Sequence, residues 1–253
     1  MCRYGRVMRS PRRDRVALAT WPSSNSARIN ARLQLDVEDL AVAQPGITPV
    51  AAVGWAVAQG LRAHPAVNRR VVLYRIRANP TVRVSFAVDL PSDLQVAVLD
   101  CADALSQREF QRQLVRSVRA ARSGSGPFAS VTSVMSVFPV VVARPALRLW
   151  SLVTAGLGLP ILGFSAAPFG AALVSSVAAF DLTAVDVPFV PFSRCALVVS
   201  VGAARLGVVV RDGQVTVRNV IDVAVTADHR ICDGAQFASF TRDVLGHCGV
   251  KVG

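Results

Sequence analysis

The alternation of apolar and polar residues along the chain predicts a β-sheet with helices packed on it. In the segment 27–36 every second residue is apolar, which is the period of a half-buried strand. The segment 50–63 is mostly apolar and follows Thr48 and Pro49, an N-cap and first-turn pattern that starts helices. A largely buried helix is therefore expected there.

Similar patterns recur to the end of the chain. Ser106 and Glu109 have capping-box spacing before an amphipathic helix at 107–122, and a second amphipathic helix starts near 235. Asp212 and Gly213 form a strong hairpin-turn signal. Further strands are expected at 71–76, 82–90, 94–99, 171–177, 196–202, 206–211, 215–218 and 220–226. The pattern predicts one α/β domain with a mixed sheet.

Two segments stand outside this domain pattern. Residues 1–24 are expected to be an irregular, flexible arm that precedes a single domain over 25–253. Within that domain, about 128–168 reads as an apolar insertion, with helical character over 128–150. The arm holds a cluster of arginines: Arg3, Arg6, Arg9, Arg12, Arg13 and Arg15.

Composition narrows the class of function. The net charge of +12 comes almost entirely from arginines, which are spread out apart from the N-terminal cluster. No aromatic residues interleave with that cluster in a pattern that suggests base stacking, so nucleic-acid binding is not expected. The 5 cysteines are widely spaced without a CxxC pair, which argues against a disulfide scaffold or a metal site. The start of the chain lacks an apolar signal segment, and a cytoplasmic protein is expected.

Two uncharged runs, 123–143 and 149–180, have the length of membrane spans. Prolines and glycines interrupt both runs, and the end of the second reads as a strand. A buried or oligomer-facing surface, or a peripheral membrane contact, is therefore preferred to an integral span.

The candidate chemistry centres on one of the three histidines. His229 ends an apolar strand, and Asp233 and Gly234 follow before a helix. Histidine is the commonest general base because it titrates near neutral pH. The residues alone leave a purely structural role for His229 equally open. His64 reads as structural, His247 as an exposed residue near the C-terminus, and Cys232 as a packing residue.

The segment 228–235, DHRICDGA, resembles the DHRxxDGA signature of the catalytic domain of 2-oxo acid dehydrogenase acyltransferases. Chloramphenicol acetyltransferases, which share that fold, carry the same HxxxDG. Segments 64–68 (HPAVN), 84–98, 170–177 and 191–202 also resemble family segments in the same order, over about residues 25–248. The resemblance implies a two-layer α/β sandwich of the chloramphenicol acetyltransferase type.

The resemblance implies a site as well as a fold. His229 would be the general base in acyl transfer between coenzyme A and a thiol or hydroxyl. Ser176 would donate a hydrogen bond to the tetrahedral oxyanion, with Ser175 as the alternative if the register shifts by one. Asp233 would orient the loop by pairing with an N-terminal arginine such as Arg15, and Asn68 would contact the substrate.

The resemblance also implies partners. Family members form homotrimers with the active site between subunits, and no bound metal is expected. No lipoyl domain precedes the catalytic region in this sequence, so the chain is expected to lack its own lipoyl arm and to use a small-molecule or separate lipoyl-type acceptor. The insertion at 128–168 is a candidate lid over an acyl chain or a membrane contact. The alternative function is a non-catalytic trimeric homologue for binding or assembly.

Overall fold

The computed structural model describes residues 11–90, 93–125, 138–159, 167–211 and 213–250. Its main feature is a mixed six-stranded sheet in the order β1-β8-β7-β6-β4-β5. Pairs β1·β8, β7·β8 and β4·β5 are antiparallel, and β4·β6 and β6·β7 are parallel. The bounds are β1 Arg28–Asp36, β4 Val84–Leu90, β5 Asp93–Leu99, β6 Ala172–Ser176, β7 Leu197–Arg211 and β8 Gln214–Asp228.

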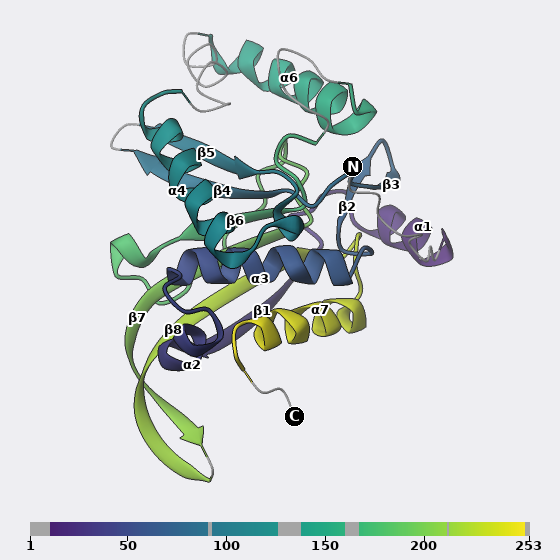
Figure 1. Ribbon diagram of the computed structural model, residues 1–253. Helices are drawn as coiled ribbons and strands as arrows, with labels where there is room; N and C mark the ends of the chain where they lie inside the picture. The colour runs from purple at the N-terminus through teal and green to yellow at the C-terminus, as the bar shows by residue number, and fades with distance from the viewer. Residues whose placement is uncertain (1–10, 91–92, 126–137, 160–166, 212, 251–253) are drawn as a thin grey trace.

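Helices cover one face of this sheet (Figure 1). They are α2 (Val37–Ala43), α3 (Pro49–Ala63), α4 (Gln107–Arg122) and α7 (Gly234–His247), and the short 3₁₀ turn η1 (Ala102–Ala104) precedes α4. The predicted capping box at Ser106 and Glu109 is present at the start of α4. The expected mixed sheet with helices packed on it is confirmed.

Helix α3 lies at the centre of the larger apolar core. Its small residues let neighbours approach closely: a Cβ added to Gly54 would lie 2.5 Å from the ring of Phe86, and one added to Gly60 would lie 2.9 Å from the ring of Phe240. Because interiors are close-packed, glycine at these positions sets the distance of α3 from the sheet and from α7.

The side chains of β6 alternate between the two faces of the sheet. Ala172 and Val174 belong to the core beneath the helices, and Leu173 packs with Phe169 and Cys195 on the opposite face. The two-residue period therefore assigns Ser176 to the helix-covered side and Ser175 to the other.

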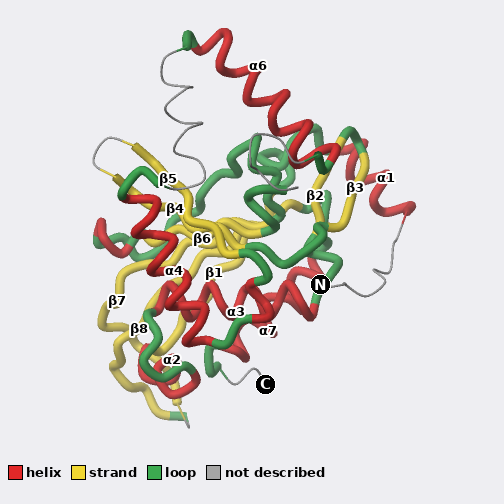
Figure 2. The backbone as a smooth tube through the Cα atoms, turned by 45° about the horizontal axis from the view of Figure 1, so that its top comes forward, coloured by secondary structure: helices red, strands yellow, loops and turns green. Residues whose placement is uncertain are grey.

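Three local predictions were wrong. Residues Pro11–Thr20 form helix α1 rather than an irregular arm. The strand expected at 71–76 is a hairpin of β2 (Arg69–Val72) and β3 (Arg75–Ala78), because Leu73 and Tyr74 take positive φ values of 43° and 58° and reverse the chain. The small β2–β3 sheet lies beside α1 (Figures 1 and 2). The strands expected from 196 to 211 are one strand, β7, with an irregularity between Val201 and Ala204, and those expected at 215–218 and 220–226 are likewise one strand, β8.

The part of the apolar insertion that the structure describes forms α6 (Val140–Ser151) and a π-helical turn, η2 (Leu152–Leu157). The predicted helical residues 128–137 lie outside the described residues. In Figure 1, α6 stands apart from the sheet. Its exposed face is apolar at Val140, Val141 and Leu149 and also carries two arginines, Arg144 and Arg148.

Within the described residues, Val140–Leu157 is long and apolar enough to cross a membrane, and 22% of it is buried. Length and composition alone are weak grounds for a span. The exposed apolar surface fits a partner subunit, a lid or a lipid surface equally well.

A pair of glycine substitutions tests the packing of the sheet. A Cβ at Gly202 would overlap the backbone oxygen of Thr183, whereas a Cβ at Gly246 in α7 meets nothing within 4 Å. Gly202→Ala should lower the free energy of unfolding by about 1–3 kcal/mol. Gly246→Ala should raise it by about 0.5–1 kcal/mol, because alanine has the higher helix propensity. Urea unfolding measures both, and equal effects would contradict the described packing.

Candidate active site

The end of β8 fixes the position of His229. The backbone N–H of His229 donates to the carbonyl of Ala27 at 2.7 Å and so continues the pairing of β8 with β1. The ring nitrogen Nδ1 lies 2.9 Å from the carbonyl oxygen of Cys232. A carbonyl can only accept, so this contact requires the proton on Nδ1 and leaves the lone pair of the neutral ring on Nε2.

Asp233 holds the other end of the loop. Its Oδ1 accepts from the backbone N–H of Gln236 at 2.8 Å, and the Gln236 side chain accepts from the Asp233 N–H at 3.2 Å. This capping box starts α7. The carboxylate also lies 3.5 Å from Nε of Arg13. The predicted brace is therefore present with a different arginine, because Arg15 is exposed and lies on another face of the short helix.

Helix α1 clamps the His229 loop through arginine. The Arg13 guanidinium donates to the carbonyls of His229 at 2.8 Å and Ile231 at 3.2 Å. Arg69 also donates to the Ile231 carbonyl and forms an ion pair with Asp14 at 3.5 Å. Charged donors on loop carbonyls are among the stronger hydrogen bonds, so they fix the loop between two segments distant in sequence.

The ring of Trp21 contacts the ring of His229, with centroids 5.0 Å apart and planes inclined by 53°. The sequence prediction missed Trp21, Arg13 and Arg69 as residues of this site. The N-terminal arginine cluster was the one sequence feature that indicated such contacts. The positions of its arginines in the sequence did not show which of them reaches the His229 loop.

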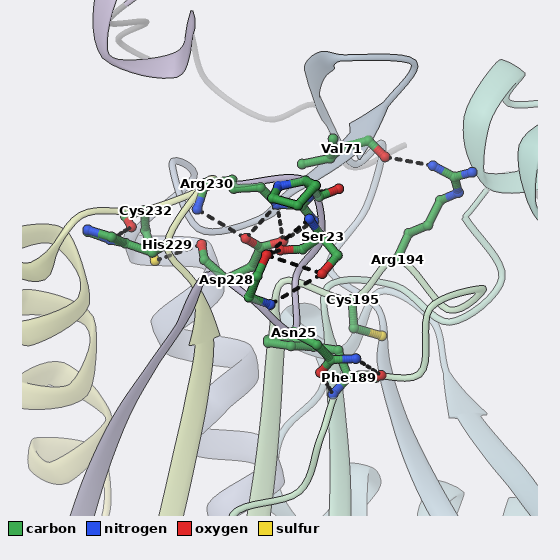
Figure 3. A network of polar contacts seen from close by, with 12 residues as sticks. Ser23, Asn25, Val71, Phe189, Arg194, Cys195, Asp228, His229, Arg230 and Cys232 are labelled. Carbon is green, nitrogen blue, oxygen red and sulfur yellow. Dashed lines mark hydrogen bonds and ion pairs between the residues drawn. The ribbon is translucent and has the colours of Figure 1, made fainter. Parts of the chain in front are cut away.

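Asp228 is neutralised by its neighbour Arg230. Arg230 binds Asp228 in a bidentate manner, with Nε to Oδ1 at 3.0 Å and Nη2 to Oδ2 at 2.7 Å (Figure 3). Asp228 is only 2% exposed, and a buried carboxylate needs such a partner. Its two oxygens are committed to Arg230, so Asp228 is a structural acid.

The predicted oxyanion residue lies far from His229 within one chain. Ser176 is paired with Val201 on β7, which is paired with Val223 on β8, six residues before His229. At about 3.3 Å per residue this separates the two positions by about 20 Å along the strands. One chain therefore does not bring Ser176 and His229 together.

Asn68 is buried and has partners for its side chain inside the chain. Its Nδ2 donates to the Thr81 carbonyl at 3.3 Å, and its Oδ1 accepts from Asn79 at 3.1 Å. These bonds give Asn68 a structural role beside the β2–β3 hairpin, and substrate contact stays a prediction.

The remaining candidates lie away from the loop or lack reactivity. His64 forms an ion-pair contact with Asp243 at 2.7 Å between α3 and α7, and exposed His247 packs edge-on against Trp55. Burial raises the pKa of the Cys232 thiol to about 12, which disfavours the nucleophilic thiolate. In the described ranges, no cluster of His, Cys, Asp or Glu is arranged to hold a metal ion.

Comparison with known proteins identifies the family. The profile described as "2-oxoacid dehydrogenases acyltransferase (catalytic domain)" matches residues 23–133 and 170–247. The gap in the match falls within the apolar insertion. A curated relative, the dihydrolipoyllysine-residue acetyltransferase component of the acetoin cleaving system of Bacillus subtilis (strain 168), is 24% identical over 239 residues. That alignment covers 87% of this chain and 48% of the relative, so the chain spans about half the length of the curated relative it matches.

Solved structures show the same fold. A probable dihydrolipoamide acetyltransferase from Listeria monocytogenes superposes with a TM-score of 0.65 at 16% identity, covering 96% of this chain and 94% of that one. The cubic core of the pyruvate dehydrogenase multienzyme complex gives 0.64 at 19% identity, with 97% and 93% covered. A chloramphenicol acetyltransferase gives 0.57 at 13% identity, with 92% and 94% covered.

The profile match over most of the chain, together with the shared fold, confirms the resemblance carried by the DHRICDGA segment. The chain belongs to the family of 2-oxoacid dehydrogenase acyltransferase catalytic domains.

Proposed function

We propose that the protein is a coenzyme A-dependent acyltransferase that moves an acyl group between a coenzyme A thioester and a thiol or hydroxyl acceptor. The observation that carries this proposal is the orientation of His229. Its Nδ1 is bound to the Cys232 carbonyl, which leaves Nε2 as the basic nitrogen. The loop that holds the ring is fixed by Arg13 and by the Asp233 cap. A preoriented base of this kind is what proton abstraction needs.

The proposed reaction has two steps. Nε2 of His229 takes the proton of the acceptor thiol or hydroxyl, whose sulfur or oxygen attacks the thioester carbonyl and forms a tetrahedral oxyanion. A serine hydroxyl, Ser176 by the resemblance, donates a hydrogen bond to that oxyanion. The intermediate then collapses, the carbon–sulfur bond to coenzyme A breaks, and the leaving thiolate takes the proton back from the imidazolium.

The separation of His229 from Ser176 supports a site built between subunits, and we propose a homotrimer. The hairpin of β7 and β8 offers surface for a neighbour: Val208 pairs with Val217 and Val210 with Val215, and all four are 61–73% exposed. A contiguous exposed apolar face of this kind is typical of an interaction surface.

The acceptor class follows from the relatives. The curated relative is named for acetyl transfer to a dihydrolipoyl lysine residue, so a lipoyl-type thiol on another protein, or a small molecule, is the proposed acceptor. A cytoplasmic location and contact of α6 with a lipid surface remain predictions.

The second candidate function is a non-catalytic trimeric homologue with a binding or assembly role. Two observations favour it. The ring of Trp21 contacts the ring of His229, and the side-chain amide of Asn68 forms hydrogen bonds within the chain. The His229→Ala experiment below separates the two functions.

Replacing His229 by alanine should abolish the proposed transfer. General-base catalysis contributes about 10²–10⁴ in rate, so turnover of acetyl-CoA and longer acyl-CoA with dihydrolipoamide should fall by at least about 10². Release of coenzyme A, measured with a thiol reagent, reports turnover. Equal rates for wild type and His229→Ala would refute the base assignment, and no turnover by the wild type with any acceptor would favour the binding function.

Ser176→Ala should lower kcat by about 10²–10³ and leave KM nearly unchanged, because the hydroxyl acts on the oxyanion. Ser175→Ala is the matched control, since its side chain lies on the other face of the sheet. If Ser175→Ala causes the larger loss, the register assignment is wrong.

Subunit mixing tests the shared site. His229→Ala and Ser176→Ala chains, each with strongly reduced activity, should regain activity when unfolded, mixed and refolded together, because some mixed trimers then pair an intact His229 with an intact Ser176. Light scattering gives the oligomeric state in parallel. A monomer, or trimers that stay inactive on mixing, would contradict the site between subunits.

Asp233→Asn distinguishes a brace from a proton-transfer group. Asparagine caps helices as well as aspartate does, so the free energy of unfolding and the activity should stay close to wild type. Asp233→Ala should lower the free energy of unfolding by about 0.5–2 kcal/mol through loss of the cap. Thermal unfolding and turnover measure both, and an inactive but stable Asp233→Asn protein would return Asp233 to a catalytic role.

A further inference from the structure

A second polar site lies beside the His229 loop. It is a pocket of about 200 Å³ between the 22–24 turn, Val71 of β2, the 190–195 turn and the end of β8. Pockets that enclose drug-sized ligands measure about 300–1,000 Å³, so this one suits a single small group. Its charged lining residues are Arg194, Arg230 and Asp228.

The pocket has one positive charge without a balancing acid. Asp228 and Arg230 neutralise each other in their bidentate pair. Arg194 donates from Nε to Ser151 Oγ and from Nη1 to the Val71 carbonyl, both at 2.8 Å. Across the described part of the chain, no carboxylate pairs with Arg194 and its Nη2 donates to no acceptor.

The Arg194 guanidinium is held in place before any ligand arrives. Buried Ser151 accepts from Arg194 Nε and donates to the Phe192 carbonyl at 2.7 Å. The backbone of Arg194 has φ 55°, which non-glycine residues seldom adopt, so the surrounding turn determines its position. In Figure 3 its side chain reaches toward Val71, on the other side of the Asp228–Arg230 pair from His229. Preorganisation of this kind lowers the entropic cost of binding.

The surroundings of Arg194 favour an anion. Burial, and to a smaller extent the positive charge of Arg230, lower the pKa of Arg194, and an anion beside the guanidinium would stabilise its charged form. Part of the wall is apolar, from Pro22, Val190 and Pro191. Apolar walls lower the local dielectric constant and strengthen attraction between charges, and a planar guanidinium matches carboxylate and phosphate oxygens.

We propose that this pocket binds a small oxyanion group, a carboxylate or phosphate, carried by the molecule that reacts at His229. Asp228 directly precedes His229, and Pro22 directly follows Trp21, which contacts the His229 ring. The pocket therefore adjoins both the His229 loop and the segment that carries Trp21. The identity of the ligand as a substrate rests on the proposed function, whereas anion binding does not.

The lining residues of the pocket from Ser23 onward lie in the two segments that match the family profile, but one residue that orients Arg194 does not. Ser151, which orients Arg194, lies on α6 between the two segments that match the family profile. The insertion thus supplies a positioning residue for the anion site.

Direct binding tests the site without reference to catalysis. Succinate and inorganic phosphate are titrated calorimetrically at constant ionic strength into wild type, Arg194→Gln, Arg194→Lys and the surface control Arg116→Gln. Binding should weaken at least tenfold in Arg194→Gln, weaken less in Arg194→Lys, and stay unchanged in Arg116→Gln. Neutral succinamide should not bind. Tighter binding of succinate than phosphate assigns the carboxylate source, and the reverse assigns phosphate.

A kinetic comparison links the site to the reaction. In Arg194→Gln the KM for succinyl-CoA should rise at least tenfold, while the KM for butyryl-CoA stays near wild type. The anion site is refuted if succinate and phosphate bind folded Arg194→Gln as tightly as wild type, or if neither binds wild type. Either result refutes the site even if acyl transfer is shown to depend on His229. If anion binding depends on Arg194 but the protein shows no acyl transfer, the anion site is supported and only the proposed function is refuted.

Discussion

The clamp on the His229 loop is the interaction on which the candidate site depends. The loop between β8 and α7 presents the carbonyls of His229 and Ile231 to Arg13 of α1 and Arg69 of β2. An unpaired buried carbonyl costs about 1–3 kcal/mol, and Arg13 and Arg69 remove that cost. With the carbonyls bound and α7 capped by Asp233, the Cys232 carbonyl is in position to hold the imidazole.

The sheet register explains why this clamp cannot complete a site by itself. β6 and β7 run parallel, and Ser176 ends β6 level with the middle of β8 rather than with its end. No rotamer change spans about 20 Å, so a group from elsewhere must face His229 if an oxyanion is to be stabilised there. The exposed apolar residues of the β7–β8 hairpin are the surface that the proposed second chain would contact.

The insertion is coupled to the same region. Helix α6 leaves its apolar face exposed, yet its last residue, Ser151, is buried and bound to both Phe192 and Arg194. Arg70 from β2 donates to the Ala155 carbonyl in the turn that follows. The C-terminal end of α6 and the turn after it are thus hydrogen-bonded to Arg194 and Arg70. A ligand at Arg194 and a partner bound to α6 would therefore contact parts of the chain that are directly connected.

Local pattern determined much of this protein. Alternation and capping signals located β1, β4, β5, β6, α3, α4 and α7, because strand and helix periods depend on neighbours in sequence. The DHRICDGA segment located His229 and the Asp233 cap, since both are set within a few residues. Tertiary structure decided the rest. That Arg13 rather than Arg15 reaches Asp233, and that Trp21 contacts His229, depends on contacts between residues more than 200 positions apart in sequence. The local pattern around each residue carries no information about such a partner.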